Sequence, residues 1–373
     1  MSGNPLSAEF IQSVIEQACV IQAIPAPTFQ EARRASYFVD DFRELGLSDI
    51  QLDAAGNVLA RLPGRGQARP LVISAHMDTV FPMETPLALH IAGDRIAGPG
   101  IGDNALGLAA AAGIVRLLKK QKIALPGDVW LAMNVGEEGL GDLRGIQAIA
   151  DRFKDEPLAY LVIEGMGLGT VLHRGLGVER YKISVQTAGG HSWVDYGLPS
   201  AIHELARLVV HLANLPLPQT PATTLNVGII HGGTSVNTIA SQAYLELDLR
   251  SEDSAALADL VKQVFQIAER IRRPGVQVYL DRIGKRQAGS IPEQHPLVRL
   301  AQEVLDELGI ETRLDIASTD ANLPLSRGFP AICLGVTCGS SSHSLDEYIQ
   351  TPPVGLGLAQ LYLMLTRIWN RLG

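Results

Sequence analysis

The order of strand-like and helix-like segments constrains the fold of this 373-residue chain more than any other feature of its sequence. Its first third alternates helical segments with apolar runs of strand length, at Val58–Leu62, Leu71–Ala75, Val129–Val135 and Leu158–Ile163. The alternation resumes near the C-terminus, with a further run at Ala331–Val336. This pattern predicts the α/β class, with a mixed, largely parallel sheet and helices on both faces.

The middle of the chain follows a different order of elements. Strand, helix, strand, strand, helix and strand are expected at Tyr181–Thr187, Pro199–Leu215, Thr223–Ile230, Ala243–Arg250, 253–272 and Val276–Ile283. This β-α-β-β-α-β order is that of a ferredoxin-like sandwich, a small independent domain. We therefore expect one domain built from residues 1–176 and 288–373, interrupted by an inserted domain at 177–287.

The charge and the cysteine content limit which partners and which cellular compartment we expect for this protein. The chain has 39 acidic against 31 basic residues and a formal charge of −8, which predicts no nucleic-acid partner. Apolar runs such as Ala105–Val115 fall short of the ~20 residues that a membrane span needs, which predicts no membrane association. Three cysteines make no disulfide framework, and Met1–Pro5 lacks the basic start of a signal peptide. We expect a soluble cytoplasmic protein.

Metal-binding residue types recur just beyond the strand-like runs. They are His76 and Asp78 after Leu71–Ala75, Glu137 and Glu138 after 130–136, Glu164 after Leu161–Ile163, and His343 in the loop after Ala331–Val336. Asp103 lies in a glycine-rich turn before an Ala/Leu-rich helix. Ligands of open α/β sheets bind beyond the carboxyl ends of the strands, so we expect these side chains to form one site.

The spacing of these residues suits a pair of metal ions. His76 and Asp78 face the same way on an extended chain, so the carboxylate can orient the imidazole. Two divalent ions would carry four positive charges, against three negative charges from Asp103, Glu138 and Glu164, and a bridging hydroxide would supply the fourth. Histidine and carboxylate ligands without cysteine suit Zn²⁺, with Co²⁺ or Mn²⁺ as substitutes.

Each residue taken singly also has a purely structural explanation. His76 could be a hydrogen-bonded histidine at a strand end, the two glutamates a solvated pair, and Asp103 a turn former. Gly100, Gly102 and Ala105 imitate a dinucleotide fingerprint, but no clear strand precedes them and no acidic strand end follows. The recurrence of ligand types in one topological position favours the metal site.

Several segments together resemble the dinuclear zinc peptidase/aminoacylase family, which includes peptidase T, glutamate carboxypeptidase, acetylornithine deacetylase and succinyl-diaminopimelate desuccinylase. The segments are Ser74–Val80, Gly102–Gly107, Gly136–Gly139, Glu164–Gly165, Gly189–Ser192 and His343–Glu347. The stretch from Ser318 onward most resembles the tripeptidase-like branch. Two positions depart from many relatives: Asn104 replaces a second Asp, and Trp193 replaces a small residue.

The resemblance implies a role for each proposed ligand. Asp103 would bridge two zinc ions, His76 and Glu164 would complete one site, and Glu138 and His343 would complete the other. Asp78 would orient His76. Glu137 would be the general base, and the Asp103–Asn104 peptide would be cis.

The resemblance also assigns the inserted domain as a lid that forms a homodimer. His191 would stabilise the oxyanion across the dimer, Asn237 and Arg250 would contact substrate, and Asp320 would line the pocket. The implied activity is hydrolysis of a peptide or N-acyl amide bond in a small substrate, foremost a di- or tripeptide exopeptidase. An N-acyl amino acid deacylase, a non-catalytic metal-binding homologue and a phosphoesterase are the alternatives.

Overall fold

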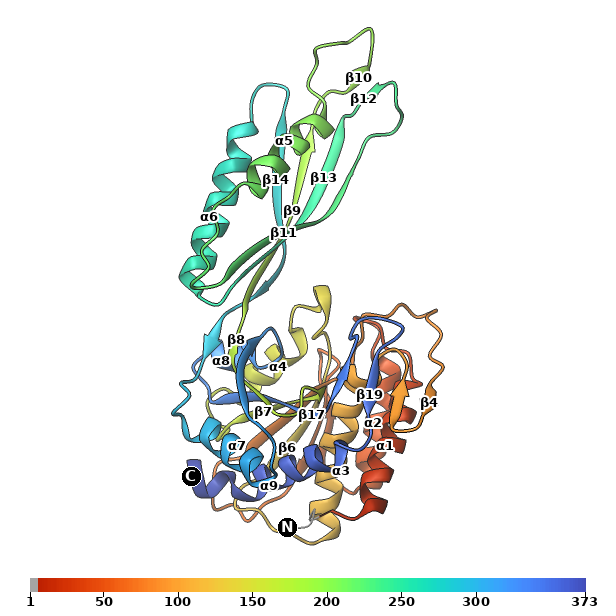
Figure 1. Cartoon of the computed structure of the whole chain (residues 1–373), viewed down its shortest axis with the longest axis vertical. Coiled ribbons are helices and arrows are strands. Elements are labelled where there is room, and N and C mark those ends of the chain that lie inside the picture. Colours follow the sequence, from red (N-terminus) through yellow and green to blue (C-terminus); the bar gives the residue numbers. More distant parts are fainter. Residues whose placement is uncertain (1–5) are drawn as a thin grey trace. The chain divides into compact units, whose positions relative to one another are not determined.

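The computed structural model describes residues 6–373, so Met1–Pro5, on which the signal-peptide expectation rests, lie outside the described residues. The chain divides into two compact units (Figure 1). Leu176–Ala288 forms the inserted unit, and the chain through Gly175 together with Gly289–Gly373 forms the larger unit. Each unit is built around its own hydrophobic core.

A nine-stranded sheet forms the centre of the larger unit. Its strands are β1 (Ser48–Leu52), β2 (Val58–Leu62), β3 (Leu71–His76), β6 (Val129–Asn134), β7 (Tyr160–Met166), β8 (Thr170–Gly175), β15 (Gly289–Ser290), β16 (Arg313–Ala317) and β17 (Ala331–Thr337). They follow the order β1-β2-β6-β3-β7-β17-β8-β15, and β16 pairs with β8. The central strands β6, β3, β7 and β17 are parallel, while the flanking pairs β1–β2, β2–β6 and β17–β8 are antiparallel. The predicted mixed, largely parallel α/β sheet is confirmed.

Helices cover this sheet. They are α1 (Ala8–Gln22), α2 (Ala32–Glu44), α3 (Gly107–Lys120), α4 (Arg144–Phe153), α7 (Pro296–Glu307), α8 (Asn322–Ser326) and α9 (Val354–Leu372). Every residue of β3 and β17 is buried, which requires helices on both faces of these strands. Local sequence fixes several helix starts: the Ser7 side chain caps α1, and Pro296 occupies the first turn of α7.

A small second sheet joins distant parts of the larger unit. Its order is β18 (Gly339–Ser340), β19 (Tyr348–Gln350), β5 (Arg95–Ala97) and β4 (His90–Ala92). It therefore ties the chain just before the wide turn η1 (Ile101–Leu106) to the loop that carries His343.

One helical stretch, Ile101–Lys120, is long and apolar enough to cross a membrane, counting only the part of the chain that the structure describes. It is longer than the run Ala105–Val115 that stands out in the sequence. Within its most apolar window, 89% of the residues are buried inside the fold, as in the core helix of a globular unit.

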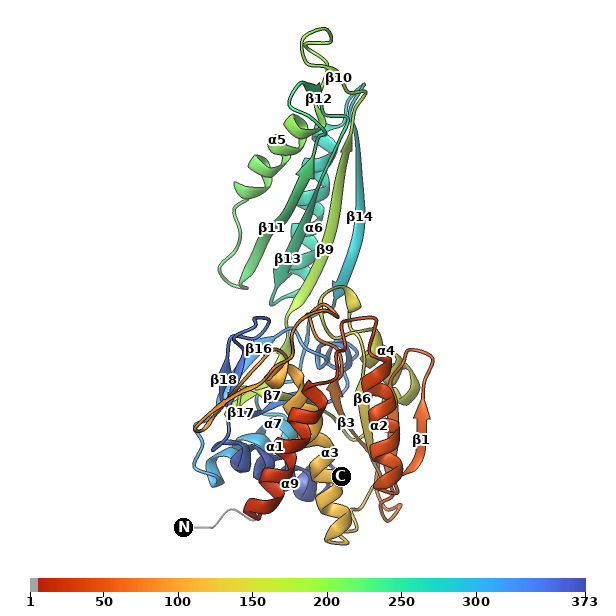
Figure 2. The ribbon, with the colours of Figure 1, turned by 90° about the vertical axis from the view of Figure 1, so that its right-hand side faces the viewer.

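The inserted unit is a four-stranded antiparallel sheet with two helices (Figures 1 and 2). In chain order it contains β9 (Gly177–Gln186), α5 (Ala201–Ala213), β11 (Thr223–Gly232), β13 (Gln242–Ser251), α6 (Ser254–Ile271) and β14 (Gln277–Arg286), with the sheet order β11-β13-β9-β14. The predicted β-α-β-β-α-β order is thus present. Two short strands, β10 (Gly190–His191) and β12 (Thr238–Ile239), pair at one end of this sheet.

Candidate metal centre

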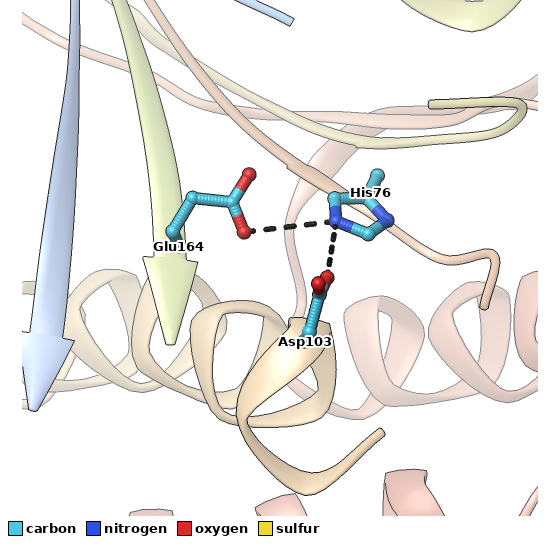
Figure 3. Close-up of side chains that lie close together, drawn as sticks. All are labelled: His76, Asp103 and Glu164. Carbon is cyan, nitrogen blue, oxygen red and sulfur yellow. Dashed lines mark ion pairs between the residues drawn. The ribbon is translucent and has the colours of Figure 1, made fainter. Parts of the chain in front are cut away.

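The parallel strands bring the predicted ligands to one edge of the large sheet. His76 is the last residue of β3, Glu164 lies near the end of β7, and Glu137 and Glu138 follow β6. Because β6, β3 and β7 are adjacent and parallel, their carboxyl ends meet. Figure 3 shows the side chains of His76, Asp103 and Glu164 pointing toward one another from two strands and from η1.

Asp103 stands between two groups of ligands. Its Oδ1 lies 3.1 Å from His76 Nε2, and its Oδ2 lies 3.2 Å from His343 Nε2. Glu164 Oε2 approaches His76 Nε2 at 3.6 Å, while Glu138 Oε1 approaches His343 Nε2 at 3.1 Å. Two three-residue sets that share Asp103 have the geometry to hold a metal ion: His76, Asp103 and Glu164, and Asp103, Glu138 and His343. A third such set, His76, Glu137 and Glu138, does not contain Asp103.

The hydrogen bonds of His76 test whether this centre fits a metal ion. Its Nδ1 lies 3.1 Å from the main-chain oxygen of Asp78, so Nδ1 carries a proton and donates it to that oxygen. Nε2 then faces carboxylate oxygens of Asp103 and Glu164. A cation, either a proton or a metal ion, must therefore stand between Nε2 and these oxygens. Nitrogen and carboxylate donors at this spacing fit a divalent ion.

The pKa values of these side chains reflect the same need for a cation. Burial alone would lower the pKa of His76, but Glu164 and Asp103 outweigh it and hold that pKa well above its usual value. Hydrogen bonds to Asp103 and Glu138 raise the pKa of His343 to about 10. Burial raises the pKa of Glu164 to about 7. Bound divalent ions would replace these protons as counter-charges.

Asp78 has a wider role than the resemblance implies. Its carboxylate lies 3.5 Å from His76 Nδ1, farther than its own main-chain oxygen. The carboxylate oxygens instead accept hydrogen bonds from the main-chain N–H groups of Glu137 and Glu138, at 3.0 and 2.9 Å, and from the Thr28 hydroxyl at 2.9 Å. Asp78 therefore orients His76 mainly through its backbone and holds the two glutamates with its side chain.

Glu137 is buried beside the ligands. Its carboxylate forms a group of metal-binding type with the side chains of His76 and Glu138. It belongs to neither of the two sets that share Asp103. This position leaves Glu137 able to exchange a proton with a molecule bound at the centre.

Sequence reasoning missed three residues that support the centre. Asn104 is completely buried; its Nδ2 donates to the main-chain oxygen of Ile163 and its Oδ1 accepts from the Gly165 N–H, both at 2.9 Å, so it holds the strand on either side of Glu164. An amide has both the donor and the acceptor that these two bonds need, whereas an ionised carboxylate can only accept. This difference gives a physical reason for Asn instead of Asp at this position. The Asp103–Asn104 peptide is cis, as expected.

The other two supporting residues are Arg34 and Glu347. Arg34 is buried and donates to the main-chain oxygens of Met77, at 2.7 Å, and Ile24, at 2.9 Å, so it holds the segment between His76 and Asp78. Burial lowers the pKa of Arg34 to about 10. Glu347 binds the backbone of the loop that carries Asp103. Its place at the end of the segment His343–Glu347 was the one available sequence signal.

The remaining predicted site residues are Asp320 in the larger unit and three residues of the inserted unit. Asp320 is completely buried, and its Oδ2 accepts from Asn134 Nδ2 at 2.7 Å, so it supports the end of β6. Burial is the main cause of the raised pKa of Glu164, and the negative charge of Asp320 also contributes to it. His191, Asn237 and Arg250 belong to the inserted unit.

Within the inserted unit, the structure brings only two of these three residues together. The Ser192 N–H donates to the main-chain oxygen of Asn237, and His191 pairs with Thr238. Arg250 pairs with Val178 at the opposite end of β13, where its Nε donates to Asp248 Oδ1 at 2.8 Å. At roughly 3.3 Å per residue, the length of that strand separates Arg250 from His191 in one protomer.

Known proteins share both the sequence pattern and the fold. The profile of peptidase family M20/M25/M40 matches residues 72–367. Succinyl-diaminopimelate desuccinylase of Corynebacterium glutamicum is 24% identical over 336 residues, which cover 87% of this chain and 88% of that protein. Carboxypeptidase G2 of Pseudomonas sp. is 25% identical over 338 residues, which cover 85% and 79%.

Solved structures resemble the whole chain. A tripeptidase from Staphylococcus aureus matches with a TM-score of 0.83 at 22% identity, covering 96% of this chain and 99% of that one. Aminopeptidase PepT from Bacillus cereus matches with a TM-score of 0.79 at 20% identity and the same coverage. These likenesses confirm the fold. Since the profile covers most of the chain, and the ligands converge at its strand ends, the chain belongs to peptidase family M20/M25/M40 and is a metal-dependent hydrolase.

Proposed function

We propose that this protein is an exopeptidase that cleaves the peptide bond of di- or tripeptides at a centre of two divalent ions, with Zn²⁺ as the native metal and Co²⁺ or Mn²⁺ as substitutes. The observation that carries the proposal is the shared position of Asp103, whose two oxygens face two separate ligand sets. Bound divalent ions would polarise the scissile carbonyl and lower the pKa of a bound water.

The chain's own residues supply the proton transfers. Glu137 takes a proton from the attacking water and passes it to the leaving amine. Asp78 holds the main chain of Glu137, so the base stays beside the ligands during this transfer. His191 donates a hydrogen bond to the developing oxyanion, and Asn237 and Arg250 contact the rest of the substrate.

A second candidate function is deacylation of N-acyl amino acids. Its support is the desuccinylase relative and an acetylornithine deacetylase of Pectobacterium carotovorum, 25% identical over 315 residues. The tripeptidase and aminopeptidase folds support the peptidase instead. Peptides and N-acyl amino acids would both place an amide carbonyl at the metal centre. The two functions therefore differ only in the chemical groups attached to the amide bond.

A substrate panel separates these functions. Protein loaded with Zn²⁺ or Co²⁺ is assayed with di- and tripeptides, N-acetyl and N-succinyl amino acids, and a phosphate ester. We expect the highest kcat/KM for a peptide with a free N-terminus. A higher value for an N-acyl amino acid would favour the deacylase. If the protein purified without chelator held no stoichiometric divalent ion and cleaved none of these compounds, the proposal would fail.

We propose that two copies associate through the inserted unit. Strand β11 is an edge of its sheet within the described chain, and it exposes 49% of Ile229 and 57% of Ile230. The apolar Val210 on α5 is also exposed. An exposed apolar edge strand offers unpaired main-chain groups with which another chain can pair, and a two-fold interface would cover this edge in both copies. In this dimer, His191 of one copy acts at the metal centre of the other.

Mixing two inactive variants tests this arrangement. Glu137→Gln and His191→Ala are each expected to be nearly inactive. After the two are unfolded and refolded together, random pairing makes half of the dimers mixed, and each mixed dimer has one intact site if His191 acts across the interface. Activity should return to about a quarter of the wild-type value. Dimers without restored activity would show that His191 acts within its own chain, and a monomer at assay concentration would exclude the interface.

We also propose that the protein works in the cytoplasm, without nucleic-acid or membrane partners. The support is the net charge of −8 and the three cysteines, Cys19, Cys333 and Cys338, all of which are free thiols.

A further inference from the structure

The carboxylate of Glu347 is directed at the backbone of the loop that carries Asp103. The side chain is completely buried. Its Oε1 accepts hydrogen bonds from the N–H groups of Gly102 and Asp103, at 2.7 and 2.8 Å, and its Oε2 accepts from Gly100 at 3.2 Å. One side chain therefore binds three main-chain N–H groups of this loop.

The loop also packs closely against Met166. A side-chain carbon at Gly102 would lie 2.7 Å from the Met166 sulfur, which shows how closely the loop packs against the end of β7. Gly100 adopts a φ of 75°, which glycine tolerates without strain. The loop is therefore held by its hydrogen bonds to Glu347 and by its packing against Met166, and these contacts set the position of the Asp103 backbone.

Glu347 also anchors the loop that carries His343. It lies four residues after His343, and its N–H donates to the Ser344 oxygen at 3.2 Å. Its main-chain oxygen accepts from Gly98 at 2.8 Å, and the next residue, Tyr348, pairs with Ala97. His343 itself is half exposed, so little else in the fold packs around its ring.

We infer that Glu347 is a positioning residue that sets the distance between Asp103 and His343, and thereby the affinity of the metal set formed by Asp103, Glu138 and His343. The inference deepens the proposed function and rests on it, because it assumes that the two sets hold ions. Glu164 has its own support in Asn104, whereas the loop of His343 is anchored by Glu347. The effect of Glu347 should therefore be larger on the set formed by Asp103, Glu138 and His343.

Substituting Glu347→Gln tests this inference with little change of shape. One of the two oxygens becomes an NH₂ group, which cannot accept a hydrogen bond from a main-chain N–H. Removal of a residue that orients metal ligands typically lowers metal affinity about 10- to 100-fold. We expect this loss at one of the two ions when metal-free protein is titrated with Co²⁺ and followed by calorimetry. The visible absorption of the Co²⁺ at that site should change as well.

The matched control is Asp346→Asn. Asp346 is the neighbouring residue, carries the same charge and is exposed. This variant should bind both Co²⁺ ions with wild-type affinity and spectrum. Equal losses of Co²⁺ affinity in Glu347→Gln and Asp346→Asn would show a general effect of the lost charge, and would overturn the inference.

Further outcomes separate this inference from the proposed function. If Glu347→Gln binds both ions as the wild type does, with an unchanged Co²⁺ spectrum, Glu347 does not position the ligands. If that variant does not fold, Glu347→Asp keeps the charge on a shorter side chain and should show the same selective loss. Failure of both variants to fold would make Glu347 a folding residue only, and would also overturn the inference. If the wild-type protein binds no divalent ion, the proposed function itself fails.

Discussion

Replacing Glu137 with Gln should lower kcat by about 10²- to 10⁴-fold while both metal ions remain bound. Gln has the same shape as Glu, but it cannot accept the proton of the attacking water. The two ligand sets that share Asp103 do not contain Glu137, so metal content should stay at two ions for each chain. Metal analysis and kcat measured on the same preparation check both parts of this prediction.

Glu138→Gln is the matched variant, because it removes the same charge from the next residue. It should weaken one ion, since Glu138 lies 3.1 Å from His343 Nε2 within a ligand set. The third group, formed by His76, Glu137 and Glu138, makes the opposite assignment geometrically conceivable. Loss of an ion from Glu137→Gln, with both ions kept in Glu138→Gln, would exchange the roles of the two glutamates.

Asp103→Asn should remove both ions. Asp103 is the one residue that belongs to both ligand sets, with an oxygen near each histidine. Asn keeps the shape but loses the charge and one of the two oxygen donors. Since bound ions supply several kcal/mol of transition-state stabilisation, kcat/KM should fall by about 10³-fold or more.

Residues that belong to only one of the two ligand sets provide the comparison for Asp103. Glu164→Gln and His343→Asn should each weaken one ion and leave the other in place. Metal titration and the rise in Tm on addition of Zn²⁺ measure this difference, because an ion that binds only the folded state stabilises it. A protein with Asp103→Asn that still binds two ions would show that Asp103 does not bridge the centre.

The sequence predicted the α/β fold and the meeting of the candidate metal ligands for the same physical reason. Apolar runs of strand length identify buried parallel strands, and the residues that follow them must meet at one edge of the sheet. His76, Glu164 and the pair Glu137 and Glu138 could be recognised in this way without any knowledge of their contacts. The order of strands and helices in the inserted unit was likewise predicted from its pattern of apolar residues.

The sequence did not predict the supporting contacts. The carboxylate of Glu347 bonds to the Asp103 N–H across 244 positions of the chain, and Asn104 bonds to residues about 60 positions away. No periodicity marks such a pair, because each partner is a main-chain group that every residue carries. The hydrogen bond from Asn134 to Asp320 is of the same kind, because it joins residues 186 positions apart.

The sequence by itself therefore determined five of the nine strands, β2, β3, β6, β7 and β17, and the residue types that stand at the carboxyl edge of the sheet, because both depend on local hydrophobic patterning. The strands β1, β8, β15 and β16 were not predicted. Only the tertiary structure decided that Asp103 stands between His76 and His343, that the Asp78 side chain holds the two glutamates, and that Glu347 holds the loop of Asp103. These contacts join loops that follow different strands. Their geometry depends on how the whole unit packs, and no short stretch of sequence contains that information.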